Sequence, residues 1–269
     1  MRYAACNELV HDRPFAEACA LIARHGYQGI ELAPYSLADD PLRIPPAQAR
    51  EIRRTIRDAG LECVGLHWLL KAPRGLHITT PDIGVRRRSW EAVRALVDFC
   101  REVGGELVVL GSGKQRGTQG ISREAATAIL REELAGLASH LAQSGVTLLL
   151  EPLNDRYDHP DYFCTSSDQA AQICRKIGSE RLKMLFDCYH MQIMEGDLIK
   201  HIERNIDVIG HFHSAAVPGR GELYQGEVNY PFVLSRVENL GYKGVFGLEY
   251  VPSIDDEASL KKTLEYLRT

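Results

Sequence analysis

The sequence predicts a single-domain α/β protein, a (β/α)8 TIM barrel that takes up residues 1–269. Short apolar runs alternate with longer amphipathic stretches about eight times along the chain. Several runs, among them VTLLLE and ELVVLG, are apolar on both faces. Parallel strands have this character when helices cover one side and a barrel core fills the other. A length of 269 residues fits one such barrel without a second domain.

Eight strands are expected in chain order. They are Tyr3–Cys6, Gly29–Leu32, Cys63–His67, Leu107–Leu110, Thr147–Glu151, Met184–Asp187, Ile209–His213 and Val245–Tyr250. The phrases RHGYQGIEL, DAGLECVGL, QSGVTLLLE and NLGYKGVFGLE share one form: a helix end, a glycine, a short turn and a strand. This recurring turn favours a closed barrel over an open sheet.

Helices are expected between the strands. Gly26 follows Phe15–His25, two prolines open Ala47–Ala59, and Ser122 caps Glu124–Ser144. The remaining predicted helices are Ser167–Ile177, Leu198–Asn205, Phe232–Leu240 and Ala258–Leu267. The longest irregular stretches follow the third, fifth and seventh strands, where the substrate loops of a barrel lie.

The composition predicts a soluble, cytoplasmic protein. The chain is 45% hydrophobic and 25% charged, and its net charge of -4 leaves no electrostatic footprint for nucleic acid. The amino-terminal segment lacks the apolar run of a signal peptide, and no stretch approaches the roughly 20 apolar residues of a membrane span. Seven cysteines, with no C-x-x-C pair, are expected to be reduced core thiols.

Acidic and imidazole side chains end four consecutive predicted strands. Glu151 ends the fifth, Asp187 the sixth, His213 the seventh and Glu249 the eighth. Because strand ends converge in a barrel, these side chains are expected to meet. Three carboxylates and one imidazole suit Mn²⁺, Mg²⁺ or Co²⁺, with Zn²⁺ also compatible. A single acidic residue at a strand end is usually a helix cap, but four in register would repel one another without a cation.

Other polar residues follow the same strand ends. His190 stands three residues after Asp187 and is expected to donate to a substrate oxygen. His67 stands beside an indole and suits one wall of a sugar pocket. A loop histidine and a satisfied core histidine remain the respective alternatives. Arg220 follows a Pro-Gly turn, where its guanidinium could hold a hydroxyl, carboxylate or phosphate, or be solvated.

A second set of residues gives weaker signals. His211 precedes His213 by two residues, so both can face the same side of a strand, and it is expected to support the site from the barrel interior. The remaining residues that follow or end strands are Glu8, Glu31, Asn154, Lys114 and Arg116.

Five motifs together resemble a known family. They are Glu151-Pro-Leu-Asn154, Phe186-Asp187-x-x-His190, His211-Phe-His213, Pro218-Gly219-Arg220-x-Glu222 and Gly247-Leu-Glu249-Tyr250. The set is similar to the xylose-isomerase-like TIM-barrel superfamily, and within it to the D-tagatose/D-psicose 3-epimerase and hydroxypyruvate isomerase branch. The resemblance spans essentially the whole chain.

The resemblance implies roles for the matching residues. It makes Glu151, Asp187, His213 and Glu249 the metal ligands, with Glu151 and Glu249 also acting as the acid/base pair. It places His190 and Arg220 at substrate oxygens. His67 and Asn154 complete the expected substrate-binding set. Two features match different branches of the superfamily. The Pro-Gly-Arg loop is similar to hydroxypyruvate isomerases, whereas His213 is more like the epimerases. The acidic residue expected after the Glu-Pro-x-Asn segment is shifted to Asp158.

The expected activity is metal-dependent isomerisation or epimerisation of a ketose or small hydroxy-carbonyl compound. A proton would move through an enediolate, which a chelated cation stabilises. The same residues would also suit an inosose-dehydratase-like lyase, an AP-endonuclease-type DNA repair enzyme or a non-catalytic sugar-binding barrel. The expected partner is a small molecule, not nucleic acid or a membrane, and homo-oligomerisation is left open.

Overall fold

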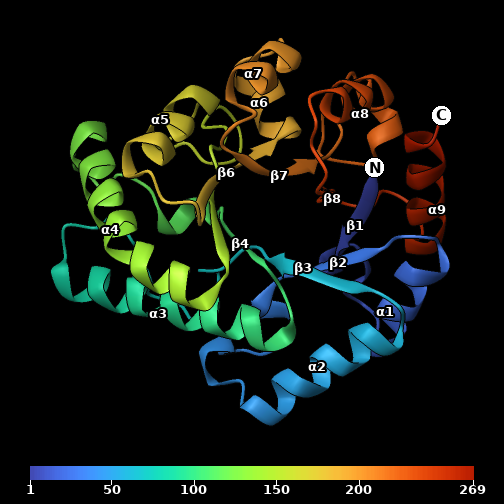
Figure 1. Ribbon diagram of the computed structural model, residues 1–269, viewed down its shortest axis with the longest axis horizontal. Coiled ribbons are helices and arrows are strands. Elements are labelled where there is room, and N and C mark those ends of the chain that lie inside the picture. Colours follow the sequence, from blue (N-terminus) through green and yellow to red (C-terminus); the bar gives the residue numbers. More distant parts are fainter.

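A computed structural model describes all residues, 1–269, and confirms the predicted barrel (Figure 1). The strands are β1 Arg2–Cys6, β2 Gly29–Leu32, β3 Glu62–Leu66, β4 Leu107–Leu110, β5 Thr147–Leu150, β6 Leu182–Asp187, β7 Ile209–Ser214 and β8 Val245–Leu248. Each strand pairs in parallel with the next, and β8 pairs with β1 to close the sheet. All eight carboxyl ends therefore open on one face.

Helices surround the strands as an outer layer (Figure 1). They are α1 Phe15–Arg24, α2 Pro46–Asp58, α3 Ile83–Val103, α4 Arg123–Ser144, α5 Ser167–Ile177, α6 Cys188–Met194, α7 Leu198–Asn205, α8 Tyr230–Asn239 and α9 Asp256–Leu267. The last helix packs back against the first strand, since the Tyr3 hydroxyl donates to the Leu267 carbonyl at 3.2 Å. None of these helices is both long enough and apolar enough to cross a membrane.

One long helix, α3, was absent from the predicted set. It fills most of the stretch after β3 that the sequence pattern left irregular. Its start is capped because the Asp82 side chain accepts from the Val85 N–H, and Gly104 ends it in the left-handed conformation. Trp90 and Leu96 lie on its buried face. The irregular part of this connection is thus limited to the segment before Asp82.

The predicted strands differ from the observed ones by at most two residues at an end. Two differences concern the site: Glu151 and Glu249 follow β5 and β8 directly and are not their last residues. Asp187 is the last residue of β6, and His213 is the last but one of β7. All seven cysteines are unpaired, and six of them are buried.

Candidate active site

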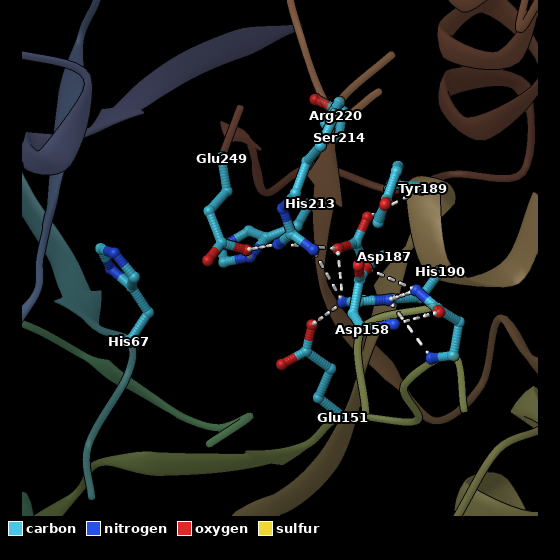
Figure 2. A network of polar contacts seen from close by, with 12 residues as sticks. His67, Glu151, Asp158, Asp187, Tyr189, His190, His213, Ser214, Arg220 and Glu249 are labelled. Atoms are coloured by element: carbon cyan, nitrogen blue, oxygen red, sulfur yellow. Dashed lines mark hydrogen bonds and ion pairs between the residues drawn. The ribbon is translucent and has the colours of Figure 1, made fainter. Parts of the chain in front are cut away.

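The four predicted ligands lie together at the carboxyl ends of β5 to β8 (Figure 2). Strand register sets their spacing, because Asp187 pairs with His213 across β6 and β7, and His213 pairs with Gly247 across β7 and β8. Ligand atoms of Glu151, His213 and Glu249 lie within 4.8 Å of one another. Asp187 forms a second such group with Glu151 and His190. Glu151 therefore joins two overlapping clusters at one centre.

The carboxylate of Glu151 lacks the partners that burial normally requires. Its Oε1 atom is buried and accepts no hydrogen bond. Burial, together with the nearby carboxylates of Glu249 and Asp187, raises the pKa of Glu151 well above its usual value. Space for the carboxylate exists only because residue 111 is glycine, since a Cβ there would overlap Oε2. A buried carboxylate oxygen without a donor, next to an imidazole, fits a divalent cation.

Glu249, by contrast, is held at both oxygens. The Trp68 indole N–H donates to Oε1 at 2.7 Å, and the Arg220 guanidinium donates to Oε2 at 2.9 Å. Burial would raise the pKa of Glu249, but Arg220 and His213 outweigh it and hold the pKa below its usual value. Trp68 and Arg220 both have left-handed backbones, with φ of 51° and 55°. Such conformations are unfavourable for residues with side chains and concentrate at functional sites.

A polar layer inside the barrel orients His213. The Nε2 atoms of His213 and His211 lie 2.8 Å and 2.9 Å from the two oxygens of Glu31, which projects from β2. Burial opposes ionisation of Glu31, yet the two imidazoles lower its pKa well below the usual value. An ionised Glu31 accepts from each Nε2–H, which leaves Nδ1 as the His213 nitrogen directed at the cluster. That Nδ1 faces the cluster, 3.1 Å from Glu249 Oε2.

His190 and Arg220 form another side of the site. His190 Nδ1 lies 2.8 Å from the Asn154 side-chain amide nitrogen. Its Nε2 lies 3.1 Å from the Arg220 guanidinium and 3.5 Å from Asp187 Oδ2. Asn154 itself is fully buried and also donates to Asp158 at 2.8 Å. It is not among the residues that line the cavity, and it holds His190 in place.

The cavity above the cluster is small. Its lining comprises His67, Trp68, Val109, Gly111, Glu151, Leu153, His159, His190, His213, Arg220 and Glu249. His67 lies on one wall as expected, and its Nε2 contacts Glu8 Oε2 at 2.6 Å. Burial lowers the pKa of His67, but Glu8 outweighs it, and the net pKa is raised.

Several functional residues escaped the sequence prediction. Glu31 carried only the weak signal of lying in a strand, Trp68 was noted as a neighbour of His67, and Gly111 was not singled out. His159 was missed altogether, because nothing in the local pattern distinguishes a loop histidine that faces the cavity.

Curated relatives of the chain are named as isomerases. A 2-oxo-tetronate isomerase of Cupriavidus necator is 44% identical over 136 residues, which is 51% of this chain and 52% of that protein. The hydroxypyruvate isomerase of Escherichia coli is 36% identical over 171 residues, 64% of this chain and 65% of that protein. A human protein provisionally named hydroxypyruvate isomerase is 34% identical over 253 residues, 90% of this chain and 85% of that protein. The chain thus spans about half to two thirds of the length of the two bacterial relatives.

Solved structures share the whole fold. An AP endonuclease, family 2, from Brucella melitensis is 28% identical, with a TM-score of 0.82 over 98% of both chains. A D-psicose 3-epimerase with D-fructose has a TM-score of 0.86 over 100% of this chain and 98% of its own, and at 16% identity it shows the fold alone. The relatives support an isomerase, as the sequence predicts. The family described as xylose isomerase-like TIM barrel matches residues 19–269, so the chain belongs to this family.

Proposed function

We propose that the protein is a divalent-metal-dependent isomerase that moves a proton between neighbouring carbons of a short hydroxy-carbonyl acid. The observation that carries the proposal is the convergence of Glu151, Asp187, His213 and Glu249, with a buried Glu151 oxygen that accepts no hydrogen bond. The names hydroxypyruvate isomerase and 2-oxo-tetronate isomerase among the relatives support this substrate class. Both name small acids that carry a keto group.

The proposed metal ligands are Glu151, Asp187, His213 and Glu249, with Mn²⁺, Mg²⁺ or Co²⁺ favoured and Zn²⁺ compatible. When bound, such a cation polarises the substrate carbonyl, acidifies the neighbouring C–H and stabilises the enediolate. Glu151 has an oxygen free of hydrogen-bond donors, and with Glu249 it would exchange protons with the substrate carbons. His190 and the Arg220 guanidinium are the proposed contacts to substrate oxygens.

The position at which the proton returns decides the product. Return to the adjacent carbon gives an isomer, whereas return to the opposite face of the same carbon gives an epimer. Leu153 and Val109 form an apolar part of the lining beside Glu151 and would limit proton exchange with bulk water. The names of the relatives favour the isomer.

The proposal is tested by proton exchange. Protein stripped with a chelator is reloaded with Mn²⁺, Mg²⁺, Co²⁺ or Zn²⁺, incubated with hydroxypyruvate in D₂O and followed by NMR. We expect metal-dependent deuterium incorporation and conversion to tartronate semialdehyde. Glu151→Gln should slow turnover roughly 10² to 10⁴-fold, the usual contribution of a general acid or base. Undiminished activity of the stripped protein, or of Glu151→Gln, would refute the proposed roles.

Assays with other substrates separate the competing functions. Loss of water from an inosose would indicate a lyase, and binding of sugars without C–H exchange would indicate a non-catalytic barrel. The 28% identity to a protein named AP endonuclease makes cleavage of an oligonucleotide with an abasic site the third comparison. The net charge of -4 disfavours that substrate.

A further inference from the structure

His159 lies in the loop after β5 and lines the cavity beside His190. The centres of the two imidazole rings are 5.7 Å apart. The backbone around His159 is well fixed, because its N–H donates to the Asn154 carbonyl at 3.2 Å and its carbonyl accepts from Tyr162 at 2.9 Å. The ring therefore belongs to the wall of the site, not to a loose surface loop.

The two nitrogens of the His159 ring have different surroundings. Nδ1 is buried against Gly113 and makes no hydrogen bond, and a Cβ at position 113 would overlap it. Since Nδ1 has no acceptor for a proton, the neutral ring carries its proton on Nε2. Burial lowers the pKa of His159 to about 4, with Asp158 opposing and Arg220 and Arg116 adding to the effect. The ring is thus neutral near pH 7, with one N–H left for the cavity.

The His159 ring shares its part of the lining with His190 and Arg220. The Arg220 guanidinium lies 3.1 Å from His190 Nε2 and 2.9 Å from Glu249 Oε2. An imidazole N–H near a guanidinium is complementary to an anion.

We propose that His159 is a substrate-binding residue whose Nε2–H, together with Arg220, holds the carboxylate of a 2-oxo acid. This inference rests on the proposed function and deepens it, because it makes the protein selective for an acid over a neutral ketose of equal length. The reacting carbons would then face Glu151 and Glu249, with the carboxylate at the other end.

The test compares two substrates that differ only at this end. Hydroxypyruvate carries a carboxylate where dihydroxyacetone carries a CH₂OH group. His159→Phe keeps a ring but removes the N–H, and His159→Gln keeps an N–H of similar reach. We expect His159→Phe to lower kcat/KM for hydroxypyruvate at least about tenfold, the value of a hydrogen bond to a charged group, chiefly through KM. The change for dihydroxyacetone should be less than about threefold, and His159→Gln should recover part of the loss.

Two further variants separate contact from folding. Gly113→Ala leaves the histidine in place but pushes its ring, so it should reproduce the selective loss. The control is His140→Phe, at a histidine of α4 that lies 3.1 Å from Asp98. It should leave kcat/KM unchanged for both substrates. Equal losses for both substrates, or none for either, would overturn the inference.

Binding distinguishes failure of this inference from failure of the proposed function. Calorimetric titration of the Mn²⁺-loaded wild type and His159→Phe with hydroxypyruvate measures the contact without turnover. A wild type that binds hydroxypyruvate tenfold more tightly than His159→Phe but never exchanges its proton would refute the isomerase alone. Equal dissociation constants would refute the role of His159.

Discussion

The substitution Glu31→Gln isolates the contribution of the polar layer inside the barrel. Glu31 accepts one hydrogen bond from His211 and one from His213, so each oxygen has an imidazole N–H opposite it. The amide that replaces this carboxylate keeps one oxygen as an acceptor for one imidazole. Its NH₂ group faces the Nε2–H of the other imidazole, so two donors oppose each other. The most direct relief is for His213 to move its proton to Nδ1 or to rotate, and either change removes the lone pair from the metal site.

The magnitude follows from the hydrogen bonds. A hydrogen bond to a charged partner is worth about 1.5–3 kcal/mol, and about 1.4 kcal/mol corresponds to a tenfold change in affinity. The expected weakening of metal binding is therefore about 10- to 100-fold, in line with the usual effect of groups that orient a metal-binding histidine. Calorimetric titration with Mn²⁺ measures the dissociation constant, and ¹⁵N NMR of the metal-free protein reports the His213 tautomer.

Glu222→Gln provides the matched control. Glu222 is also a fully buried carboxylate, but its oxygens accept from Ser253 at 2.7 Å and Ser259 at 2.9 Å, away from the predicted ligands. It should lower thermal stability without changing the Mn²⁺ dissociation constant. An unchanged constant in Glu31→Gln, or an equal rise in both variants, would show that Glu31 only stabilises the fold.

Three further predictions concern the ligands and the thiols. Gly111→Ala should lower turnover at least about 10²-fold with little change in melting temperature, because the new methyl group displaces the Glu151 carboxylate; kinetics equal to wild type would contradict this packing. His213→Ala should weaken Mn²⁺ binding in calorimetry, whereas His190→Ala should mainly lower kcat, and equal metal loss in both would favour a two-metal site. In native protein at pH 8, a disulfide-exchange dye should react slowly and chiefly with the partly exposed Cys63, since burial raises the thiol pKa to about 12 even there; rapid reaction of several thiols before unfolding would refute the buried arrangement.

The strand pattern predicted most of the fold and the position of the proposed ligands. Both depend on a local property: a short apolar run that ends in an acidic residue or histidine identifies a strand and the face on which it opens. The helix α3 was missed although Asp82 and Gly104 mark its ends. Its exposed face carries many arginines, and these obscure the apolar repeat of the buried face.

Long-range contacts were harder to predict than strand ends. Glu31 and His211 are 180 residues apart, and only the closed barrel shows that one carboxylate serves two imidazoles. Asn154 was expected to contact the substrate. A side-chain amide near a histidine can bind either the substrate or the histidine, and the sequence does not show which of the two lies nearer. The orientation of His159 depends on its packing against Gly113, which a sequence pattern does not contain.

The polar layer also bears on how such barrels recombine during evolution. The four proposed ligands all lie at the ends of β5 to β8. The carboxyl-terminal half of the barrel would therefore carry the whole ligand set if it were joined to another amino-terminal half. Glu31 belongs to β2, however, and it reaches through the centre to orient His213 from the opposite half. A carboxyl-terminal half joined to a foreign partner would therefore keep its ligands but lose their alignment, unless that partner supplied an acid at the position of Glu31. The success of chimaeras built from barrel halves of related enzymes should thus depend on a residue far from the exchanged loops.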